Sequence, residues 1–393
     1  MSESASETGK HLRNVRKRRG LTQPELATAS GVSLSIIRKL EQGERASARM
    51  ETLRKLATAL RVPTMRLKDG STEDGPTAGT EARWEAVRHA LERPPLAPEF
   101  DDDMPTVEGV RSALTASQPF FKKDQFAELA RVLPTLLRDA EALGSEGRAV
   151  RVRLLQLAGW LMVQTRQFDA AEVALQRAMD DASDRMEAAA TVNTLCWLLL
   201  RQGKLDEALT TAIRWADETE PRISRATPDE LSTWGWMLLR VSAAAVRNSQ
   251  GGQAKDALKF AKAAAVALGR EYEPQNDFLR TFGPTTVLLK RAENASVADL
   301  PEVVLRLANT IPKEGLKPTS NNTNRHFLDV SDAYAKTGQY AEAFGKLTTI
   351  QKSSPEWLPN QAYARTVLRR IVEGRRTLTP EMRRMAAAIY LEI

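Results

Sequence analysis

The side chains with the clearest chemical potential in this sequence lie in one short segment, SLSIIRKLEQG, which begins at Ser33. Ser35, Arg38 and Lys39 follow Ser33 at spacings that place polar and basic groups on one side of a helix. Hydroxyl groups hydrogen-bond to base edges, and guanidinium and ammonium groups bind base edges and phosphates. The pattern favours a helix that enters a DNA major groove. It is also consistent with solvated helix residues at Arg38 and Lys39, and with a simple helix cap at Ser33.

Helix-capping residues divide the chain around this segment into two short helices. Thr22 and Glu25 have the spacing of a capping box, in which each side chain accepts a hydrogen bond from the other residue's amide. Pro24 suits the first turn of a helix. Gly31 can adopt the left-handed conformation that ends this helix, and Gly43 can end the next one. The two predicted helices therefore have the spacing of a helix-turn-helix.

Apolar residues recur on the opposite faces of these helices and on their neighbours. They fall where crossed helices would share one small core. These residues are Leu12, Val15, Leu26, Ala27, Val32, Ile37, Leu40, Leu53, Leu56 and Leu60. The sequence predicts a compact five-helix domain over residues 10–68, preceded by a disordered segment of residues 1–9.

Three stretches of this region together resemble a known DNA-binding family. They are LRNVRKRRGLTQPELA, GVSLSIIRKLEQG and METLRKLATALRV. In type and spacing they are similar to the XRE family, the helix-turn-helix of Cro and the phage repressors. The resemblance runs from about Gly9 to Leu67, and it implies double-stranded DNA as a partner.

The resemblance also implies residue roles. It assigns Gln23 to a phosphate contact that also steadies the recognition helix, and it pairs Arg16 with Glu41 in an internal salt bridge. The positions that face base edges or the adjacent backbone are Ser33, Leu34, Ser35, Arg38 and Lys39. Leu34 departs from the family pattern, because leucine cannot hydrogen-bond to a base and offers at most a contact with a thymine methyl group.

Basic residues are concentrated in the same region. Residues 1–68 contain 15 Lys and Arg and 6 Asp and Glu, a net charge of +9, against +7 for the whole chain. Residues 69–393 therefore carry a net charge of −2. Arg18 lies in the densest basic run, residues 13–19, and is expected to contact phosphates, since phosphate neutralisation supplies sequence-independent affinity for DNA. Alone, such a run is more often a solvated face.

Motifs for catalysis and metal binding are missing from the sequence. His11, His89 and His326 are too scattered for a local metal motif, and there is no GxxxxGK loop or GxSxG elbow. Cys196, the only cysteine, stands in the apolar run TLCWLLL, which predicts a buried and unreactive thiol. We therefore expect no cofactor and no enzymatic activity. The polar N-terminus and the lack of a long apolar stretch predict a cytoplasmic protein.

After Leu67 the composition changes. DGSTEDGPTAGTEA has few large apolar groups and predicts a flexible linker, so that residues 69–105 form a linker with one short helix around Trp84 to Leu91. From residue 106 to residue 393 the pattern is almost entirely helical. Ala171, Ala208, Ala257 and Ala343 occur in weak repeats that resemble tetratricopeptide hairpins. The fold class predicted is all-α, with an α-solenoid after the DNA-binding domain.

A solenoid of helical hairpins has a concave surface suited to binding. Six tryptophans are expected to pack between hairpins, with one or two of them free to line a pocket: Trp160, Trp197, Trp215, Trp234, Trp236 and Trp357. The combination of an XRE-type domain with such repeats resembles peptide-sensing regulators and large actinobacterial regulators. The resemblance implies asparagines that hold the backbone of an effector peptide.

Asn193 is the first candidate for that role, followed by Asn248, Asn324 and Arg325. For Asn321 and Asn322 a role in a cap or a solvated loop is at least as good an interpretation. The function predicted is a homodimeric transcriptional regulator controlled by a peptide or a small molecule. Two alternatives stay open, namely a DNA-anchored scaffold for a protein partner and, less favoured, an enzyme that uses the concave cavity.

Overall fold

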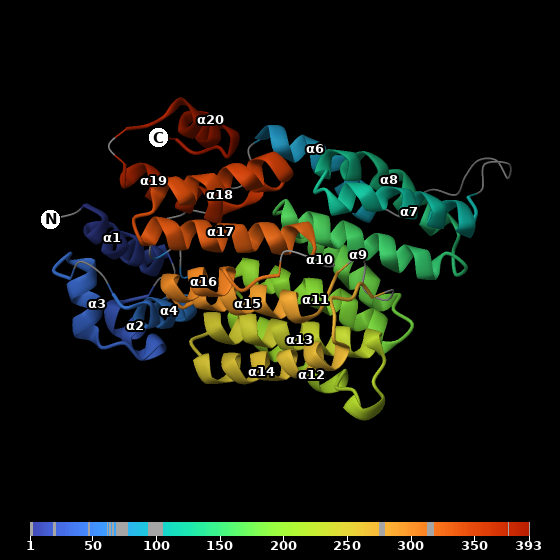
Figure 1. Ribbon diagram of the computed structural model, residues 1–393, viewed down its shortest axis with the longest axis horizontal. Helices are drawn as coiled ribbons and strands as arrows, with labels where there is room; N and C mark the ends of the chain where they lie inside the picture. The colour runs from blue at the N-terminus through green and yellow to red at the C-terminus, as the bar shows by residue number, and fades with distance from the viewer. Residues whose placement is uncertain are drawn as a thin grey trace.

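The computed structural model describes residues 3–18, 21–45, 48–60, 62, 64, 67, 78–92, 105–274, 280–312, 318–375 and 377–392. Throughout this part of the chain the fold is helical, as predicted. The only β pairing within it is a single bridge between Tyr272 and Phe282. Figure 1 shows a small N-terminal bundle, the head, beside a long array of paired helices.

The head contains α1 (Glu3–Arg18), α2 (Gln23–Ser30), α3 (Leu34–Glu41) and α4 (Met50–Ala59). Nine of the ten predicted apolar residues are buried in its core, and the tenth, Ala27, is half-buried against it. Ala57, Val62 and Leu67 also belong to this core. After Leu60 the structure describes only Val62, Thr64 and Leu67 of the head, so the prediction of a fifth helix before residue 68 falls largely outside the described residues.

The start of α1 differs from the sequence-based expectation. The helix begins at Glu3, whereas residues 1–9 were expected to be disordered, and Thr8 is 7% exposed. Gly9 explains why this end is held. A Cβ atom on Gly9 would lie 1.9 Å from the carbonyl oxygen of Leu40, so the backbones of α1 and α3 touch here. The local sequence is polar, and the contact at Gly9 is a tertiary contact that helps to hold this end of the helix.

The expected linker helix is longer than predicted and belongs to the array. Helix α6 (Ala78–Glu92) includes the last residues of the stretch that we expected to be flexible, and it packs on α8 and α10. Trp84 and Leu91 are each 1% exposed, which accounts for its docking. Residues 69–77 and 93–104 lie outside the described part of the chain.

Helices α7 to α18 form six hairpins. Their bounds are α7 (Val107–Lys122) with α8 (Phe126–Ala142), α9 (Arg148–Gln164) with α10 (Phe168–Asp180), α11 (Arg185–Gln202) with α12 (Leu205–Glu218), α13 (Pro228–Arg247) with α14 (Gly251–Leu268), α15 (Pro284–Val297) with α16 (Pro301–Ala308), and α17 (Ser320–Lys336) with α18 (Tyr340–Ser353). Two 3₁₀ turns, η2 (Ile223–Arg225) and η3 (Leu358–Asn360), occur between helices. Helices α19 (Ala362–Glu373) and α20 (Pro380–Ala388) complete the array.

The six hairpins share one turn geometry. In each hairpin, the residue two positions before the start of the second helix has a positive φ. These residues are Asp124, Arg166, Gly203, Ser249, Asp299 and Gly338. The following amide donates a hydrogen bond to the carbonyl group five residues earlier, as from Gln167 to Met162 at 2.8 Å and from Lys204 to Leu199 at 2.9 Å. This is the Schellman arrangement of a helix C-terminus. The six hairpins therefore share the backbone conformation of their turns.

The small-residue anchors occupy matching places in three of these hairpins. Ala171, Ala208 and Ala343 each lie four residues after the turn and are fully buried. In α14 the matching residue is Ala254, one helical turn before the predicted Ala257, and both are buried. A Cβ atom on Gly159 would lie 2.7 Å from the side chain of Leu175, so this glycine permits the close approach of α9 and α10.

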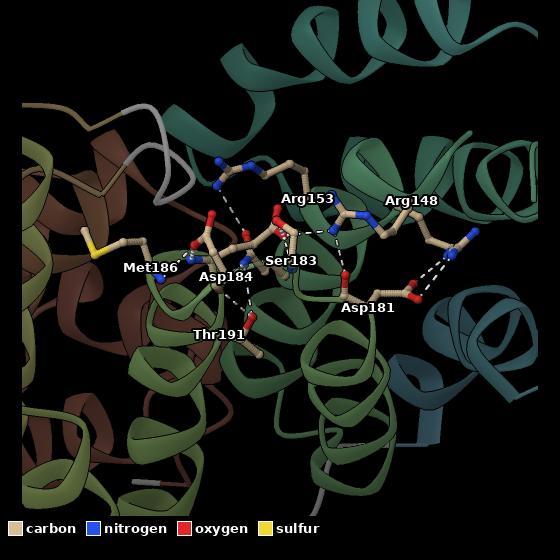
Figure 2. A network of polar contacts seen from close by, with 10 residues as sticks. Arg148, Arg153, Asp181, Ser183, Asp184, Met186 and Thr191 are labelled. Carbon is tan, nitrogen blue, oxygen red and sulfur yellow. Dashed lines mark hydrogen bonds and ion pairs between the residues drawn. The ribbon is translucent and has the colours of Figure 1, made fainter. Parts of the chain in front are cut away.

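Polar contacts fasten the loop between α10 and α11 to α9 (Figure 2). The Arg148 guanidinium donates to the carbonyl oxygen of Asp181 at 2.7 Å and to the Glu187 carboxylate at 3.1 Å. Asp184 caps α11 by accepting hydrogen bonds from the amides of Met186 and Glu187. These contacts fix the relative positions of two neighbouring hairpins. Among the described residues, no helix has both the length and the apolarity needed to cross a membrane.

Candidate nucleic-acid interface and central cavity

The two helices of the predicted helix-turn-helix have the predicted caps. The Thr22 hydroxyl accepts from the Glu25 amide at 3.3 Å, and the Glu25 carboxylate accepts from the Thr22 amide at 2.7 Å. Gly31 ends α2 with φ at +66°, a conformation that glycine adopts without strain. The Ser33 hydroxyl then accepts from the Ile36 amide at 3.4 Å at the start of α3. The capping box and the break between the helices are confirmed.

Helix α3 has one buried face and one exposed face. Ile37 and Leu40 are at most 1% exposed and anchor the helix in the head. Ser33, Ser35, Arg38 and Lys39 are exposed, and Leu34 is half-buried. Figure 1 places α3 at the outer side of the head, away from the array. The side chains predicted to face base edges or the adjacent backbone, Ser33, Leu34, Ser35, Arg38 and Lys39, therefore share this side of α3, which we call the α3 face.

A buried ion pair holds the C-terminal end of α3 against α1. The Arg16 guanidinium donates two hydrogen bonds to the Glu41 carboxylate, at 2.7 and 2.8 Å, which confirms the predicted pair. Arg16 also donates to the carbonyl oxygen of Leu21 at 2.7 Å. Burial raises the pKa of Glu41, but the hydrogen bonds from Arg16 and Gln23 outweigh this and leave the pKa below its ordinary value.

Gln23 belongs to the same hydrogen-bonded cluster as Arg16 and Glu41. Its amide nitrogen donates to the Glu41 carboxylate at 2.8 Å, which links the start of α2 to the end of α3. This contact steadies α3, as the family resemblance implies, whereas the phosphate contact of Gln23 stays a prediction. The side chain of Arg18 lies outside the described residues. Arg13 and Lys17, on the same helix, are exposed.

A cavity of about 300 Å³ opens between the array and the head. Most of its wall comes from the first helices of the hairpins, α9, α11, α13, α15 and α17, together with α19. Met50 and Arg54 of α4 and Thr64 complete the wall on the side of the head. The Arg54 guanidinium donates to the carbonyl oxygen of Val297 in α15, so one residue both touches the cavity and joins the head to the array.

The cavity wall is rich in cations. Nine Arg and Lys side chains contribute to it, against the two carboxylates of Glu293 and Asp332. Arg247 and Lys290 share Glu293, at 2.6 and 3.0 Å. Burial lowers the pKa of Lys290, the Glu293 charge opposes that shift, and the charge of Arg240 adds to it.

The effector-site residues proposed from sequence divide into two groups. Arg325 lines the cavity, where its guanidinium lies 4.7 Å from the centre of the Tyr363 ring and 3.2 Å from the carboxylate of Asp329. The three asparagines do not line it. Asn248 ends α13 and donates to Asp206 at 2.7 Å, and the Asn324 amide donates to Asp124 and Ser354.

Asn193 is fully buried, and its carbonyl oxygen accepts from the Nε of Arg240 at 2.5 Å. Because Arg240 lines the cavity, Asn193 orients a wall residue without reaching the cavity itself. Asn321 and Asn322, for which a cap or loop role was the alternative, do line the cavity. The three asparagines predicted to hold an effector therefore bond to protein groups, and the amide side chains that line the cavity are those of Gln164, Asn321, Asn322 and Gln361.

Four of the tryptophans expected to pack between hairpins also line the cavity, namely Trp160, Trp197, Trp236 and Trp357. Arg240, Arg280 and Lys290 all lie within 6 Å of the centre of the Trp236 ring. The sequence analysis missed these three cations. For Arg240 a signal was present in WMLLRVSAAAVR, where Arg240 and Arg247 interrupt an otherwise apolar or small-residue helix.

Cys196 takes no part in the cavity wall and is 1% exposed. Burial raises the pKa of its thiol to about 12, so the thiolate needed for reaction is scarce at neutral pH. The predicted buried position of Cys196 is confirmed.

Similarity to known proteins is confined to the head. A family model described as helix-turn-helix matches residues 12–67, and this part of the chain is a helix-turn-helix domain. The chain is 44% identical over 55 residues to an uncharacterized HTH-type transcriptional regulator, RghRB, of Bacillus subtilis (strain 168), a match covering 14% of this chain and 40% of that protein. It is 46% identical over 55 residues to the HTH-type transcriptional repressor RghR of the same organism, covering 14% of this chain and 41% of that protein.

The match thus spans about two fifths of the length of these curated relatives. No solved structure matches the chain.

Proposed function

We propose that the protein is a sequence-specific, DNA-binding transcriptional regulator of the cytosol, dimeric and controlled by an effector that binds in its helical array. The observation that carries the proposal is the α3 face. Its polar and basic side chains are exposed while the apolar side of the same helix is buried in a helix-turn-helix domain. Relatives of this domain are described as transcriptional regulators.

In this mechanism α3 lies in the major groove. Arg38 and Lys39 contact base edges or the adjacent backbone, Ser33 and Ser35 add hydrogen bonds, and Leu34 contacts a thymine methyl group. Gln23 and Arg18 bind phosphates. A dimer presents two such helices to half-sites that are roughly 34 Å apart, one turn of the duplex.

Control by an effector is supported by the place of the cavity. Because α4 contributes Met50 and Arg54 to the same wall as the inner helices of the array, an occupant contacts both parts of the chain. An effector that favours one orientation of the head over another shifts the population toward it. A dimer whose heads no longer match two successive major grooves binds the operator weakly.

The residue assignments are tested by binding the full-length protein to its operator and to a random duplex, with fluorescence anisotropy as the readout. We expect Arg38→Ala and Lys39→Ala to weaken operator binding about 10- to 100-fold while random DNA is affected much less. Arg18→Ala should weaken both about equally, because a phosphate contact carries no sequence information.

Arg111→Ala serves as the control, since Arg111 is exposed on α7 and pairs with Glu108 in its own helix. This variant should bind both duplexes like the wild type. An equal loss on the two duplexes from all the head variants would contradict the assigned roles.

A scaffold for a protein partner is the second candidate. Phe260 and Val266 are 56% and 66% exposed on α14, on the outside of the array, and such apolar side chains suit a protein contact. Co-purification of a stoichiometric partner that is lost in Phe260→Ser would favour this function over control by a small effector.

A further inference from the structure

Gln164, in α9, is the feature of the cavity that the proposed function does not explain. The residue is 1% exposed and lines the cavity, yet its amide nitrogen and its carbonyl oxygen have no hydrogen-bond partner among the described residues. A buried polar group without a partner costs free energy, and native proteins leave few of them. Trp357 is 2% exposed on the same wall, and its indole N–H also has no hydrogen-bond partner among the described residues. Two residues of the cavity wall thus carry buried donor and acceptor groups without a partner among the described residues, and a small rearrangement of either side chain would let a ligand satisfy them.

The charges of the cavity wall indicate that such a ligand is negatively charged. Among the described residues, nine cationic side chains of the wall face two carboxylates, and Asp299 and Asp329, which pair with Lys336 and Arg325, bring the number of carboxylates to four. Cations held close together in a poorly hydrated space repel one another, and an anion between them relieves this repulsion. Arginine also binds phosphate and carboxylate groups through two parallel hydrogen bonds.

The shape and the aromatic content define the rest of the ligand. About 300 Å³ is at the lower end of the range for small-molecule sites, so a compact molecule fits better than an extended peptide. Trp160, Trp197 and Trp236 present flat apolar surfaces between the cations. Such rings pack well against a flat or apolar group.

We propose that the cavity binds a small organic anion that carries at least two negative charges. Its charged groups contact Arg240, Arg280 and Lys290, its neutral polar atoms hydrogen-bond with Gln164, and its flat part lies against the tryptophans. The head contributes Arg54 to the same site. This ligand class specifies the effector of the proposed function and rests on it for its regulatory meaning, although binding itself is independent of DNA.

The test uses isothermal titration calorimetry on the full-length protein without DNA. The probes are AMP, 3-phosphoglycerate and citrate as compact anions with at least two charges, and adenosine as the uncharged counterpart of AMP. We expect at least one of the three anions to bind, and any binding of AMP to be tighter than that of adenosine by tenfold or more. Failure of all three anions to bind, or binding of AMP and adenosine with equal affinity, would overturn the proposal.

Variants then locate the site for the anion that binds. Arg240→Gln should weaken it about 10- to 100-fold, as expected for a charge-assisted hydrogen bond. Gln164→Met should weaken it several-fold while leaving the thermal stability of the free protein unchanged or slightly raised, because the variant removes a buried polar group that has no partner. Arg131→Gln is the control, since Arg131 is exposed on α8 and pairs with Glu128 in its own helix.

Unchanged affinity in both Arg240→Gln and Gln164→Met would place the anion elsewhere and refute the assignment. Because Gln164→Met keeps the charge of the cavity, it tests the site even if Arg240→Gln fails to fold. The separate DNA-binding assay distinguishes the two proposals. If the wild-type protein binds the anion but no operator, the proposed function as a regulator is contradicted. If it binds its operator but none of the anions, only the proposed ligand class is contradicted.

Discussion

The head and the array use cations in opposite ways. On the head, Arg38 and Lys39 are exposed on one face of α3, and the buried Arg16 has a carboxylate partner of its own. In the array, cations such as Arg240 and Lys290 point into a cavity where carboxylates are few. The same residue types therefore suit two different anions, a DNA duplex that cannot enter a cavity and a small molecule that can. Burial, more than composition, distinguishes the two roles.

The two regions also differ in how their folds are held, and Gly9 offers the sharpest test of this difference. Gly9→Ala places a methyl group against the backbone of α3, which cannot move without displacing Leu40. We expect the head to lose about 4 kcal/mol or more of stability, since overpacking against a backbone leaves little room to relax. Operator binding should be lost with it.

All seven tryptophans lie at residue 84 or beyond, so tryptophan fluorescence reports on the array alone. In Gly9→Ala the unfolding midpoint of this signal should stay close to that of the wild type. If Gly9→Ala lowers the midpoint of the fluorescence transition as well as abolishing operator binding, the head and the array unfold as one unit. That result would contradict the difference in stability proposed for the two regions.

Glu41→Gln tests the buried pair of the head. The variant leaves Arg16 buried with a neutral partner, and we expect a loss of about 3 to 4 kcal/mol. Because the folded-state pKa of Glu41 is lowered, the wild type has this stabilisation above the unfolded pKa of about 4.5 and loses it as the pH falls through the folded pKa. The difference between the two proteins in denaturant titrations should therefore shrink at acidic pH.

Glu51→Gln is the matched control, since Glu51 forms an exposed pair with Lys55 at 3.0 Å on α4. Its effect should be small, as for most surface pairs. A difference between Glu41→Gln and the wild type that grows toward acidic pH would contradict the assigned role of the pair.

Asp124→Asn is the corresponding test for the array, where burial shifts the pKa of the carboxyl group upward instead of downward. Burial raises the pKa of Asp124 to about 6, despite hydrogen bonds from Ser354 and Ser320. The folded protein then binds more protons than the unfolded chain between about pH 4 and pH 6, so this residue makes stability fall as the pH rises through that window. Relative to the wild type, the asparagine variant should gain as much as about 3 kcal/mol from pH 4 to pH 7.

Tryptophan-detected denaturation at several pH values measures this difference. A constant difference across the window would show that Asp124 does not titrate there.

Gly345→Ala has the smallest expected effect. Gly345 lies within α18, and no atom approaches the position of an added Cβ within 4 Å. Alanine should stabilise the array by up to about 1 kcal/mol through helix propensity alone. A destabilised Gly345→Ala would show that the open space on α18 is occupied in solution.

The sequence predicted the head well because its signals are local and contiguous. The capping box of Thr22 and Glu25, the break at Gly31 and the apolar positions all lie within a few residues of one another. The start of α1 escaped prediction, since it depends on the contact of Gly9 with a residue on α3.

The array was harder to predict because what recurs in it is the backbone conformation of the turns, which different residue types can adopt. The hairpins α7/α8 and α15/α16 have the shared turn, but Leu129 and Val304 occupy the place that alanine has in the others, and no small-residue signal marks them. The inner helices are buried nearly all round, so periodicity could not say which side of α13 faces the cavity. Asn193 was therefore chosen in place of Arg240, its neighbour in the structure.

The central claim is that the α3 face binds DNA by sequence, and selection from a pool of random duplexes tests it most directly. The full-length protein should enrich a short motif, and the Arg38→Ala/Lys39→Ala double variant should enrich none under the same conditions. Recovery of the same motif by the double variant, or enrichment of no motif by the wild type, would contradict the account.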